Sequence, residues 1–246
     1  MVTWTRLELD EVESTQSLAA GLAAKGALEG TVVTSKSQSA GKGRLGRDWV
    51  SPPGGLYMSV ILRPSRLARP QLISIVFALA VVEGIKTLTG LPARIRWPND
   101  IIVGTSKIGG VIAEGQSYGR EVTQLVVGVG VNCNAAVRGV KPGGEMATSL
   151  AEELGHKVRI PELRDSILDS FSRLYDRWRT GEDLIPLWAG SVGTIGMSAR
   201  VKVRGGRNEF RCRVVGLDSE GGLVIDRNGK KAVLKAEDLE RLRETP

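Results

Sequence analysis

The chain has 246 residues, 41% of them hydrophobic, and a formal net charge of +7. This length suits one large domain, or a catalytic domain with a small appended unit. The longest apolar run, Ile75–Val82, is far shorter than the roughly 18 residues that a membrane span needs, and the polar N-terminus has no signal-peptide pattern. Composition thus argues against a membrane or secreted protein, and we expect a cytoplasmic one.

The two cysteines and the single histidine exclude further kinds of site. Cys133 and Cys212 form no C-x-x-C pair, so we expect buried thiols and not a disulfide framework or a zinc site. His156 follows Gly155 at an expected helix end, with no partner that would make it a general base, so we expect it to be exposed. We predict no dedicated protein metal site.

In chain order, the pattern first predicts a short helix over Val12–Gly26, with Ser14 or Thr15 as the N-cap and Gly26 as the stop. Strands are expected at Gly30–Lys36 and Gly55–Arg63, separated by a glycine-rich loop. A buried helix opened by Pro70 should follow. Further strands are expected at 93–97, 99–104, 107–115 and 122–132, and further helices at 145–154 and 161–181.

Near residue 187 the pattern changes from long apolar segments to short strands. Four such strands are expected after Ser198, and Asn228-Gly229 is a strong signal for a type I′ hairpin. Before this point the expected strands and helices alternate irregularly along the chain, which predicts an α+β fold, a mixed sheet with helices packed on it. We therefore expect a catalytic unit at 1–187 and a small all-β barrel at 188–246.

The loop "QSAGKGRLGRDW" carries the G-x-G-x-x-G spacing of a dinucleotide site at Gly41, Gly43 and Gly46. That motif requires a helix opening at the glycines and an acidic residue about 20 positions later. The following "RDWVSPPGG" forbids a regular helix, and no Asp or Glu occurs between Trp49 and Val82. The P-loop pattern is also absent, so neither standard nucleotide motif explains this loop.

Cations concentrate around the same loop. The segment from Lys36 to Arg69 holds seven cations and one anion, Asp48. Lysine and arginine side chains alternating with glycines can wrap a phosphate or acyl phosphate, although a solvated basic loop has the same composition. Aromatic residues make up only 4% of the chain, which weakens a nucleic-acid reading because base stacking needs them.

Taken together and in order, the motifs resemble those of the biotin protein ligases. The matching segments cover essentially the whole chain and are "STQ", "QSAGKGRLGRDW", "GGLYMSVILRP", "RWPNDI", "KIGGVIAEG", "VGVGVN", "ATSL" and a terminal unit that begins "GMSARVKV". The resemblance implies a catalytic domain related to class II aminoacyl-tRNA synthetases and lipoyl ligases, followed by an SH3-like domain.

The resemblance also implies the reaction and its partners. Biotin and ATP are the substrates, Mg²⁺ arrives with ATP, and biotinyl-5′-AMP and pyrophosphate form first. A lysine of a biotin carboxyl carrier domain then takes the biotinyl group. No membrane or nucleic-acid partner is expected, because Ser14 lies too near the start for the DNA-binding domain of some family members. A homodimer is compatible with the resemblance.

Residue roles follow from the same resemblance. Lys107 and Arg44 are expected to be catalytic, with Lys107 bridging the biotin carboxyl group and the α-phosphate. The biotin site would comprise Ser14, Thr15, Gln16, Gln38, Gly41, Lys42, Gly43, Arg44, Lys107 and Gly110. The ATP site would comprise Arg44, Arg47, Trp49, Asn99, Asp100, Lys107 and Asn132.

Two positions depart from the family pattern, and two other functions stay open. Gln16 stands where the family usually has Asn, and Lys42 where Arg is common. A lipoyl or octanoyl ligase would share the fold, but polar Ser14, Thr15 and Gln38 favour a ureido ring over a lipoyl chain. A basic nucleic-acid-binding module is the alternative from another class, and salt-dependent binding without adenylate formation would reveal it.

Overall fold

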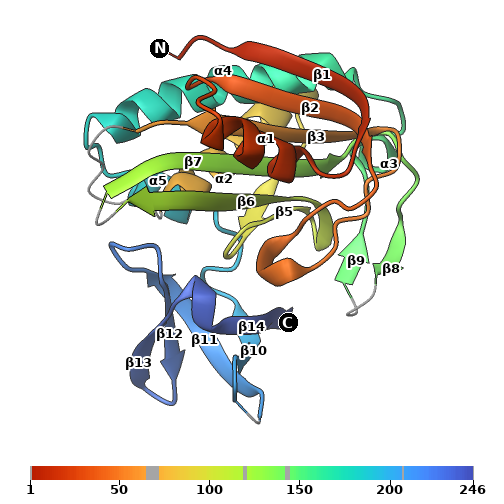
Figure 1. Ribbon diagram of the computed structural model, residues 1–246. Helices are drawn as coiled ribbons and strands as arrows, with labels where there is room; N and C mark the ends of the chain where they lie inside the picture. The colour runs from red at the N-terminus through yellow and green to blue at the C-terminus, as the bar shows by residue number, and fades with distance from the viewer. Residues whose placement is uncertain (1, 65–71, 119–120, 142–144, 207, 246) are drawn as a thin grey trace.

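The computed structural model describes residues 2–64, 72–118, 121–141, 145–206 and 208–245 (Figure 1). Its larger sheet runs in the order β1-β2-β3-β7-β6-β5-β4, and β9, which pairs with β6 and β8, adds a short extension. β1 and β2 are parallel, as are β6 and β9, and the remaining pairs are antiparallel. The strands are β1 (Thr5–Val12), β2 (Thr31–Gln38), β3 (Gly55–Leu62), β4 (Arg94–Arg96), β5 (Asp100–Val103), β6 (Ser106–Tyr118), β7 (Glu121–Asn132), β8 (Gly139–Lys141) and β9 (Glu145–Ala147). The predicted α+β fold with a mixed sheet is confirmed.

Helices cover both faces of this sheet. The short α1 lies in front of β2, β3 and β7 in Figure 1, and α2 and α4 lie behind the sheet. The helices are α1 (Thr15–Ala24), α2 (Ile73–Thr89), α3 (Leu150–Leu154), α4 (Ile160–Arg179) and α5 (Ile185–Ser191). Of the two predicted N-cap candidates, Ser14 is the N-cap of α1, and its hydroxyl accepts a hydrogen bond from the Ser17 amide. The predicted opening at Pro70 lies outside the described residues.

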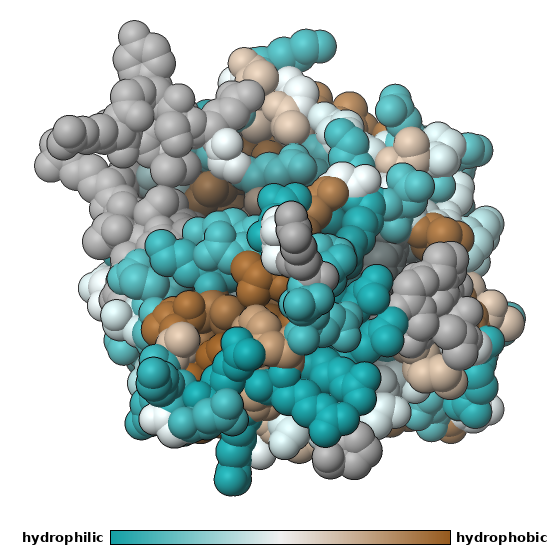
Figure 2. All heavy atoms as spheres, turned by 90° about the horizontal axis from the view of Figure 1, so that it is seen from below, coloured by the Kyte–Doolittle hydropathy of each residue, from teal (hydrophilic) through white to brown (hydrophobic). Residues whose placement is uncertain are grey.

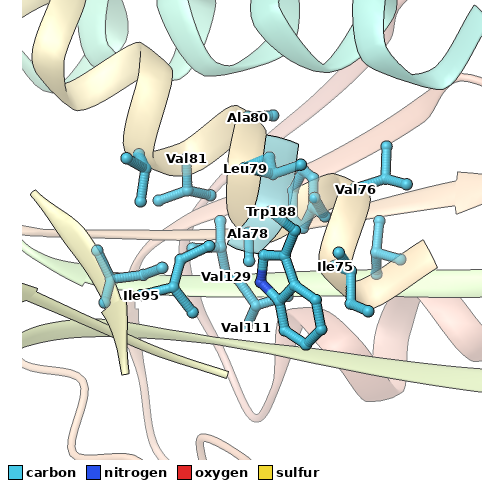
Figure 3. Close-up of a cluster of buried hydrophobic side chains, with 14 of the residues drawn as sticks. Ile75, Val76, Ala78, Leu79, Ala80, Val81, Ile95, Val111, Val129 and Trp188 are labelled. Atoms are coloured by element: carbon cyan, nitrogen blue, oxygen red, sulfur yellow. The ribbon is translucent and has the colours of Figure 1, made fainter. Parts of the chain in front are cut away.

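The main core lies between α2, α4 and the sheet. Apolar residues surround α2 on nearly all sides because the helix is sandwiched between the sheet and α4. Trp188 of α5 is 1% exposed and lies among side chains of α2 and of the sheet, including Ile75 and Val129 (Figure 3). Cys133 is also buried, as predicted, and burial raises the pKa of its thiol to about 12.

A second, antiparallel sheet follows in the order β13-β12-β11-β10-β14. Its strands are β10 (Ser198–Val203), β11 (Phe210–Leu217), β12 (Leu223–Arg227), β13 (Lys230–Leu234) and β14 (Leu239–Thr245). The hairpin turn has φ of 55° at Asn228 and 79° at Gly229, as a type I′ turn requires. The expected boundary between residues 187 and 188 falls within α5, and the division into 1–187 and 188–246 stays a prediction.

Several segments differ from their predicted structure, and neither the strand β8 nor the helix α5 was expected. β1 and β14 were not expected as strands, because each is polar and mostly exposed and so lacks a clear apolar alternation. The single helix expected at 145–154 is instead a short strand, β9, followed by α3. Ser149 caps α3: its hydroxyl accepts from the Glu152 amide and donates to the Glu152 carboxylate, so the helix cannot extend back to residue 145.

Candidate active site

One pocket of about 720 Å³ opens between the larger sheet and β14. It is bounded by the start of α1, the glycine-rich loop, the ends of β5, β6 and β7, and one edge of the second sheet. Of the residues predicted for the site, it gathers all except Gly41, namely Ser14, Thr15, Gln16, Gln38, Lys42, Gly43, Arg44, Arg47, Trp49, Asn99, Asp100, Lys107, Gly110 and Asn132.

The glycine-rich loop folds back on itself and does not open a long helix. Only a single 3-10 turn forms, at Arg44–Gly46, with Leu45 at φ 63°. The Gly43 amide donates to the Arg47 carbonyl at 2.7 Å. Gly41 supports this fold, since a Cβ there would lie 2.4 Å from the Trp49 carbonyl oxygen. The absence of a dinucleotide-type helix is therefore confirmed, and Gly41 shapes the loop behind the pocket wall.

Both loop arginines reach the second sheet. The Arg44 guanidinium donates to the Ala236 carbonyl at 2.8 Å and to the Leu239 carbonyl at 3.4 Å. Arg47 donates to the Glu240 carbonyl at 2.8 Å. Burial lowers the pKa of Arg44, partly offset by Asp100. The loop therefore bridges the two sheets over the pocket, with its cations beside the cavity.

The floor of the pocket begins with a fixed amide. Gln38 Oε1 accepts from the Thr15 amide at 2.8 Å and from the Thr15 hydroxyl at 3.1 Å. Gln38 Nε2 lies 2.8 Å from the Ser51 hydroxyl, to which it donates. Because the Thr15 N–H can only donate, the Gln38 carbonyl must face α1, and the amide has one orientation.

Ser59 of β3 continues this network to Gln16. Its hydroxyl lies 3.0 Å from the Thr15 hydroxyl and 3.1 Å from Gln16 Oε1. Three contacts thus link four oxygens in a row: Gln38 Oε1, the Thr15 hydroxyl, the Ser59 hydroxyl and Gln16 Oε1. The two hydroxyls have only two protons for these three contacts, and the amide oxygens at the two ends can only accept. If each hydroxyl donates to its amide, both offer lone pairs to the pocket. The floor is then suited to N–H groups of a ligand.

Gln16 fits the floor despite its departure from the family pattern. The side chain is 3% exposed, and Nε2 donates to the Val126 carbonyl at 3.1 Å. A Cβ at residue 128 would lie 2.5 Å from Gln16 Oε1, so Gly128 provides the room that the longer amide needs.

A lysine and a carboxylate line the same pocket. Lys107 Nζ is 2.6 Å from Asp100 Oδ1 and 5.6 Å from the centre of the Trp49 ring. Arg96 lies 3.5 Å from the other oxygen of Asp100. These side chains are mostly shielded from solvent, so the ion pairs are stronger than surface ones. One carboxylate thus stands between two cations in the pocket wall.

Two asparagines are held by main-chain carbonyls. Asn99 Nδ2 donates to Val111 at 2.9 Å, and Asn132 Nδ2 donates to Thr148 at 3.1 Å. In contrast, the buried Trp49 Nε1 has no hydrogen-bond partner among the described residues. It lies over Gly130, where a Cβ would come within 2.4 Å of this nitrogen. The indole N–H of Trp49 is therefore a buried donor left unsatisfied in the pocket wall.

Comparison with known proteins decides the family. Residues 9–132 match the model of the biotin/lipoate A/B protein ligase family. The chain belongs to this family. The matched segment contains every residue predicted for the site. It also contains the side chains around Lys107, namely Trp49, Arg96 and Asp100.

Relatives of this ligase family align over most of the chain. The bifunctional ligase/repressor BirA of Bacillus subtilis (strain 168) is 34% identical over 235 residues, which are 93% of this chain and 71% of that protein. The biotin–[acetyl-CoA-carboxylase] ligase of Paracoccus denitrificans is 32% identical over 219 residues, covering 84% and 88%.

A solved structure of the family has the same fold over nearly its full length. The biotin protein ligase from Aquifex aeolicus in complex with biotin and ATP has a TM-score of 0.83 and 26% identity. The alignment covers 98% of this chain and 99% of that one. Both sheets described here are therefore included in the likeness.

Sequence reasoning missed several residues of this ligase-family pocket. Ser59 and Arg96 lie in strands that were predicted from their apolar neighbours. A polar residue within such an apolar strand was the signal that could have marked them as pocket residues. The residues of the second sheet carried no such signal in the sequence, because their place in the pocket depends on how the two sheets pack together. The missed lining residues include Ser59, Arg96, Ile112, Gly128, Gly130, and Leu239 to Arg243.

Two negative findings apply to the described residues. They contain no group of three or more His, Cys, Asp and Glu side chains that could hold a metal ion. Nor do they contain a helix with the length and apolar character needed to span a membrane.

Proposed function

We propose that this family member is an ATP-dependent biotin protein ligase. It activates biotin to biotinyl-5′-AMP with release of pyrophosphate, and then transfers biotin to a lysine of a biotin carboxyl carrier domain. The observation that carries the proposal is that the polar floor of Thr15, Gln38 and Ser59 and the cation Lys107 share one pocket. The printed names of the relatives, a carboxylase ligase and a complex with biotin and ATP, support it.

The pocket floor would hold the ureido ring of biotin. Ser14, Thr15 and Gln38 offer hydroxyl and amide groups there, with Gln16 held in the layer beneath. Main-chain groups of Lys42, Gly43 and Gly110 would complete the biotin site. A site built for such hydrogen bonds disfavours a ligand that lacks them, since its buried polar groups would be left unpaired.

The first step joins two anions, and cations have to offset their repulsion. A carboxylate oxygen of biotin bonds to the α-phosphorus of ATP, and the bond from that phosphorus to the bridging oxygen breaks. Pyrophosphate leaves with the electron pair. Lys107 would lie between carboxylate and α-phosphate, and Arg44 and Arg47 would hold the phosphates. Bound with ATP, Mg²⁺ neutralises part of the triphosphate charge.

Nucleotide contacts are assigned to the other side of Lys107. Trp49, Asn99 and Asn132 would contact the nucleotide, and Asp100 belongs to the same cluster. The Trp49 indole N–H is a buried donor without a partner among the described residues, and both asparagine side chains are fixed by main-chain carbonyls. A wall held in place before the ligand arrives lowers the entropy lost on binding.

The second step needs access for a protein lysine. Its amine nitrogen bonds to the acyl carbon, the bond from that carbon to the phosphate oxygen breaks, AMP leaves, and the nitrogen loses a proton. No covalent enzyme intermediate is required. The loop from Lys42 to Trp49 lies against β14 and would limit the access of water to the labile adenylate.

The finer assignments belong to the same proposal. They are a class II synthetase-like catalytic unit at 1–187, an SH3-like barrel at 188–246, a cytoplasmic location, a carboxylase carrier domain as partner, and no nucleic-acid partner. A homodimer is compatible with it. Any Mg²⁺ would enter with ATP, without a dedicated protein site.

The experiment that tests the proposal gives the protein Mg-ATP, a carrier domain and either biotin or lipoate. We expect the carrier to gain the mass of one biotinyl group in the first mixture and to stay unmodified in the second. The matched control is a carrier whose acceptor lysine is replaced by arginine. A lipoyl gain without a biotinyl gain would identify a lipoyl ligase instead.

A further inference from the structure

A row of arginines crosses three adjacent strands of the second sheet. Arg200 of β10 is paired directly with Arg211 of β11 on one side and with Arg243 of β14 on the other. All three side chains are exposed, whereas the neighbouring residues Ala199 and Val201 are buried. Because side chains alternate between the two faces of a sheet, the three arginines lie on the outer face.

Neighbouring pairs extend this row into a basic surface. Lys202 is paired with Arg241, and Arg213 with Ser198. We define the arginine face as the outer side of β10, β11 and β14 with the cations Arg200, Lys202, Arg211, Arg213, Arg241 and Arg243. The side of the molecule that carries this sheet shows extensive hydrophilic surface around a hydrophobic patch (Figure 2).

The charge of this face is only partly balanced within the chain. Lys202 pairs with Glu240, and Arg241 lies 3.9 Å from Glu209. Arg200, Arg211 and Arg213, by contrast, make no ion pair with any carboxylate of the described residues. Like charges directly opposite one another across strands destabilise a sheet. An anionic partner would relieve this repulsion.

The arginine face is continuous with the pocket. Arg241 and Arg243 line the cavity, and β14 lies between the larger sheet and the rest of the second sheet (Figure 1). From Arg243 the row continues through Arg200 to Arg211, and neighbouring strands are about 4.8 Å apart. The row thus extends roughly 10 Å outward from the pocket wall.

We propose that the arginine face is the docking surface for the acceptor protein, and that the acceptor presents carboxylate side chains beside its target lysine. This inference rests on the proposed function, because a ligase must bring a protein lysine to this pocket. Cations next to the pocket opening would attract an acidic surface and orient it before the lysine enters.

A nucleic acid fits the same face less well. Single strands bind where aromatic side chains stack with bases, and no Trp or Tyr occurs after Trp188. The one aromatic residue in that stretch, Phe210, is partly buried, with the Arg227 guanidinium 4.8 Å from its ring centre. The face offers charge without a stacking surface, and its contact with the pocket favours the acceptor.

The test compares two double variants with the same change of charge. Arg200→Glu/Arg211→Glu reverses the two members of the row that lie outside the pocket, and Lys230→Glu/Lys231→Glu reverses two exposed lysines of β13, at the opposite edge of the sheet. Pyrophosphate release with biotin and Mg-ATP is measured first, without acceptor. Transfer to the biotin carrier domain of an acetyl-CoA carboxylase is then measured at about 50 mM and 500 mM salt.

We expect the arginine variant to keep wild-type pyrophosphate release and to raise the KM for the carrier about tenfold at low salt, with a smaller effect at high salt. The lysine variant should change that KM less than twofold. Equal carrier KM values in both variants would refute the docking surface. So would an unchanged carrier KM together with lost, salt-dependent binding of a DNA duplex, which would mark a nucleic-acid site. Absence of pyrophosphate release in the wild-type protein would refute the proposed function itself.

Discussion

Lys107 Nζ lies 2.6 Å from Asp100 Oδ1, so the lysine expected to activate the substrate is held by a carboxylate in the ligand-free pocket. The two residues come from neighbouring strands, β6 and β5, whose pairing also brings Asp100 opposite Gly110. The carboxylate also faces Arg96. Lys107 is therefore oriented before the anionic substrates arrive, at a place where their negative charges would meet.

Replacing Lys107 with alanine should abolish adenylate formation. The variant removes the cation that would stand between the biotin carboxylate and the α-phosphate, and the loss of one such group typically costs about 10²–10³ in kcat. Asp100 would keep Arg96 as a partner, so the fold should persist. The measurement is pyrophosphate release with biotin and Mg-ATP, with thermal unfolding as the fold control. Release near the wild-type rate would remove Lys107 from the mechanism.

The adjacent glycines of β6 offer a second prediction. A Cβ at Gly110 would meet only ordinary contacts, the nearest being the Asn99 carbonyl oxygen at 3.7 Å, whereas a Cβ at Gly109 would lie 2.7 Å from the Gly130 carbonyl oxygen. Gly110→Ala should therefore keep the wild-type Tm, while Gly109→Ala should lower it, at a cost of about 1–3 kcal/mol.

Activity should separate the same two variants. Gly110 lines the pocket, and a methyl group there would intrude on the space assigned to biotin. We expect the biotin KM of Gly110→Ala to rise about tenfold or more at unchanged Tm, which is a loss of about 1.4 kcal/mol of binding. A wild-type biotin KM would show that the ligand does not approach this residue.

The sequence predicts the part of the pocket that short segments form by themselves. Lys107 leads a strand toward two glycines, and this local pattern alone indicated a ligand site. Ser14 and Thr15 at a helix start and Gln38 at a strand end were assigned through the resemblance to biotin protein ligases. Ser59 was missed because its strand looks like ordinary buried core. The contribution of the second sheet to the pocket was missed for another reason. The contact from Arg44 to Ala236 joins residues 192 positions apart, and no local pattern encodes such packing.

Ser59→Ala tests the hydrogen-bond direction along the floor. The change removes the donor to Gln16 Oε1 and the neighbour of the Thr15 hydroxyl. A buried acceptor left unpaired costs about 1–3 kcal/mol, and the free energy of unfolding should fall by this amount.

The biotin KM of Ser59→Ala should also rise, about five- to tenfold, since a lone pair facing the ligand is lost, while kcat should change less. Ser172→Ala, another buried serine, provides a control at a site away from the pocket. A biotin KM equal to that of this control would show that Ser59 has only a structural role.

A hydrogen bond from Trp97 to Gly221 connects the catalytic unit with the second sheet, and its contribution can be tested by replacing each of two buried tryptophans with phenylalanine. Trp97 Nε1 donates to the Gly221 carbonyl of the second sheet at 3.0 Å, whereas Trp188 Nε1 has no hydrogen-bond partner among the described residues. Both side chains are almost fully buried. Trp97→Phe and Trp188→Phe therefore remove similar volume, but only the first removes a hydrogen bond between the sheets. Denaturant unfolding should show Trp97→Phe to be less stable than Trp188→Phe by about 1 kcal/mol.

The same pair links packing to activity. Trp97 lines the pocket and immediately precedes Pro98, Asn99 and Asp100, which also line it. A Cβ at Gly221 would lie 2.7 Å from Ile75 Cδ1 and 3.1 Å from Trp188 Cζ3, so the Gly221 turn packs closely against both side chains. Loosening this turn should shift β14, whose neighbouring carbonyls accept from Arg44 and Arg47. Trp97→Phe should therefore slow adenylate formation more than Trp188→Phe does. Equal rates in the two variants would mean that the hydrogen bond from Trp97 to Gly221 does not control the glycine-rich loop.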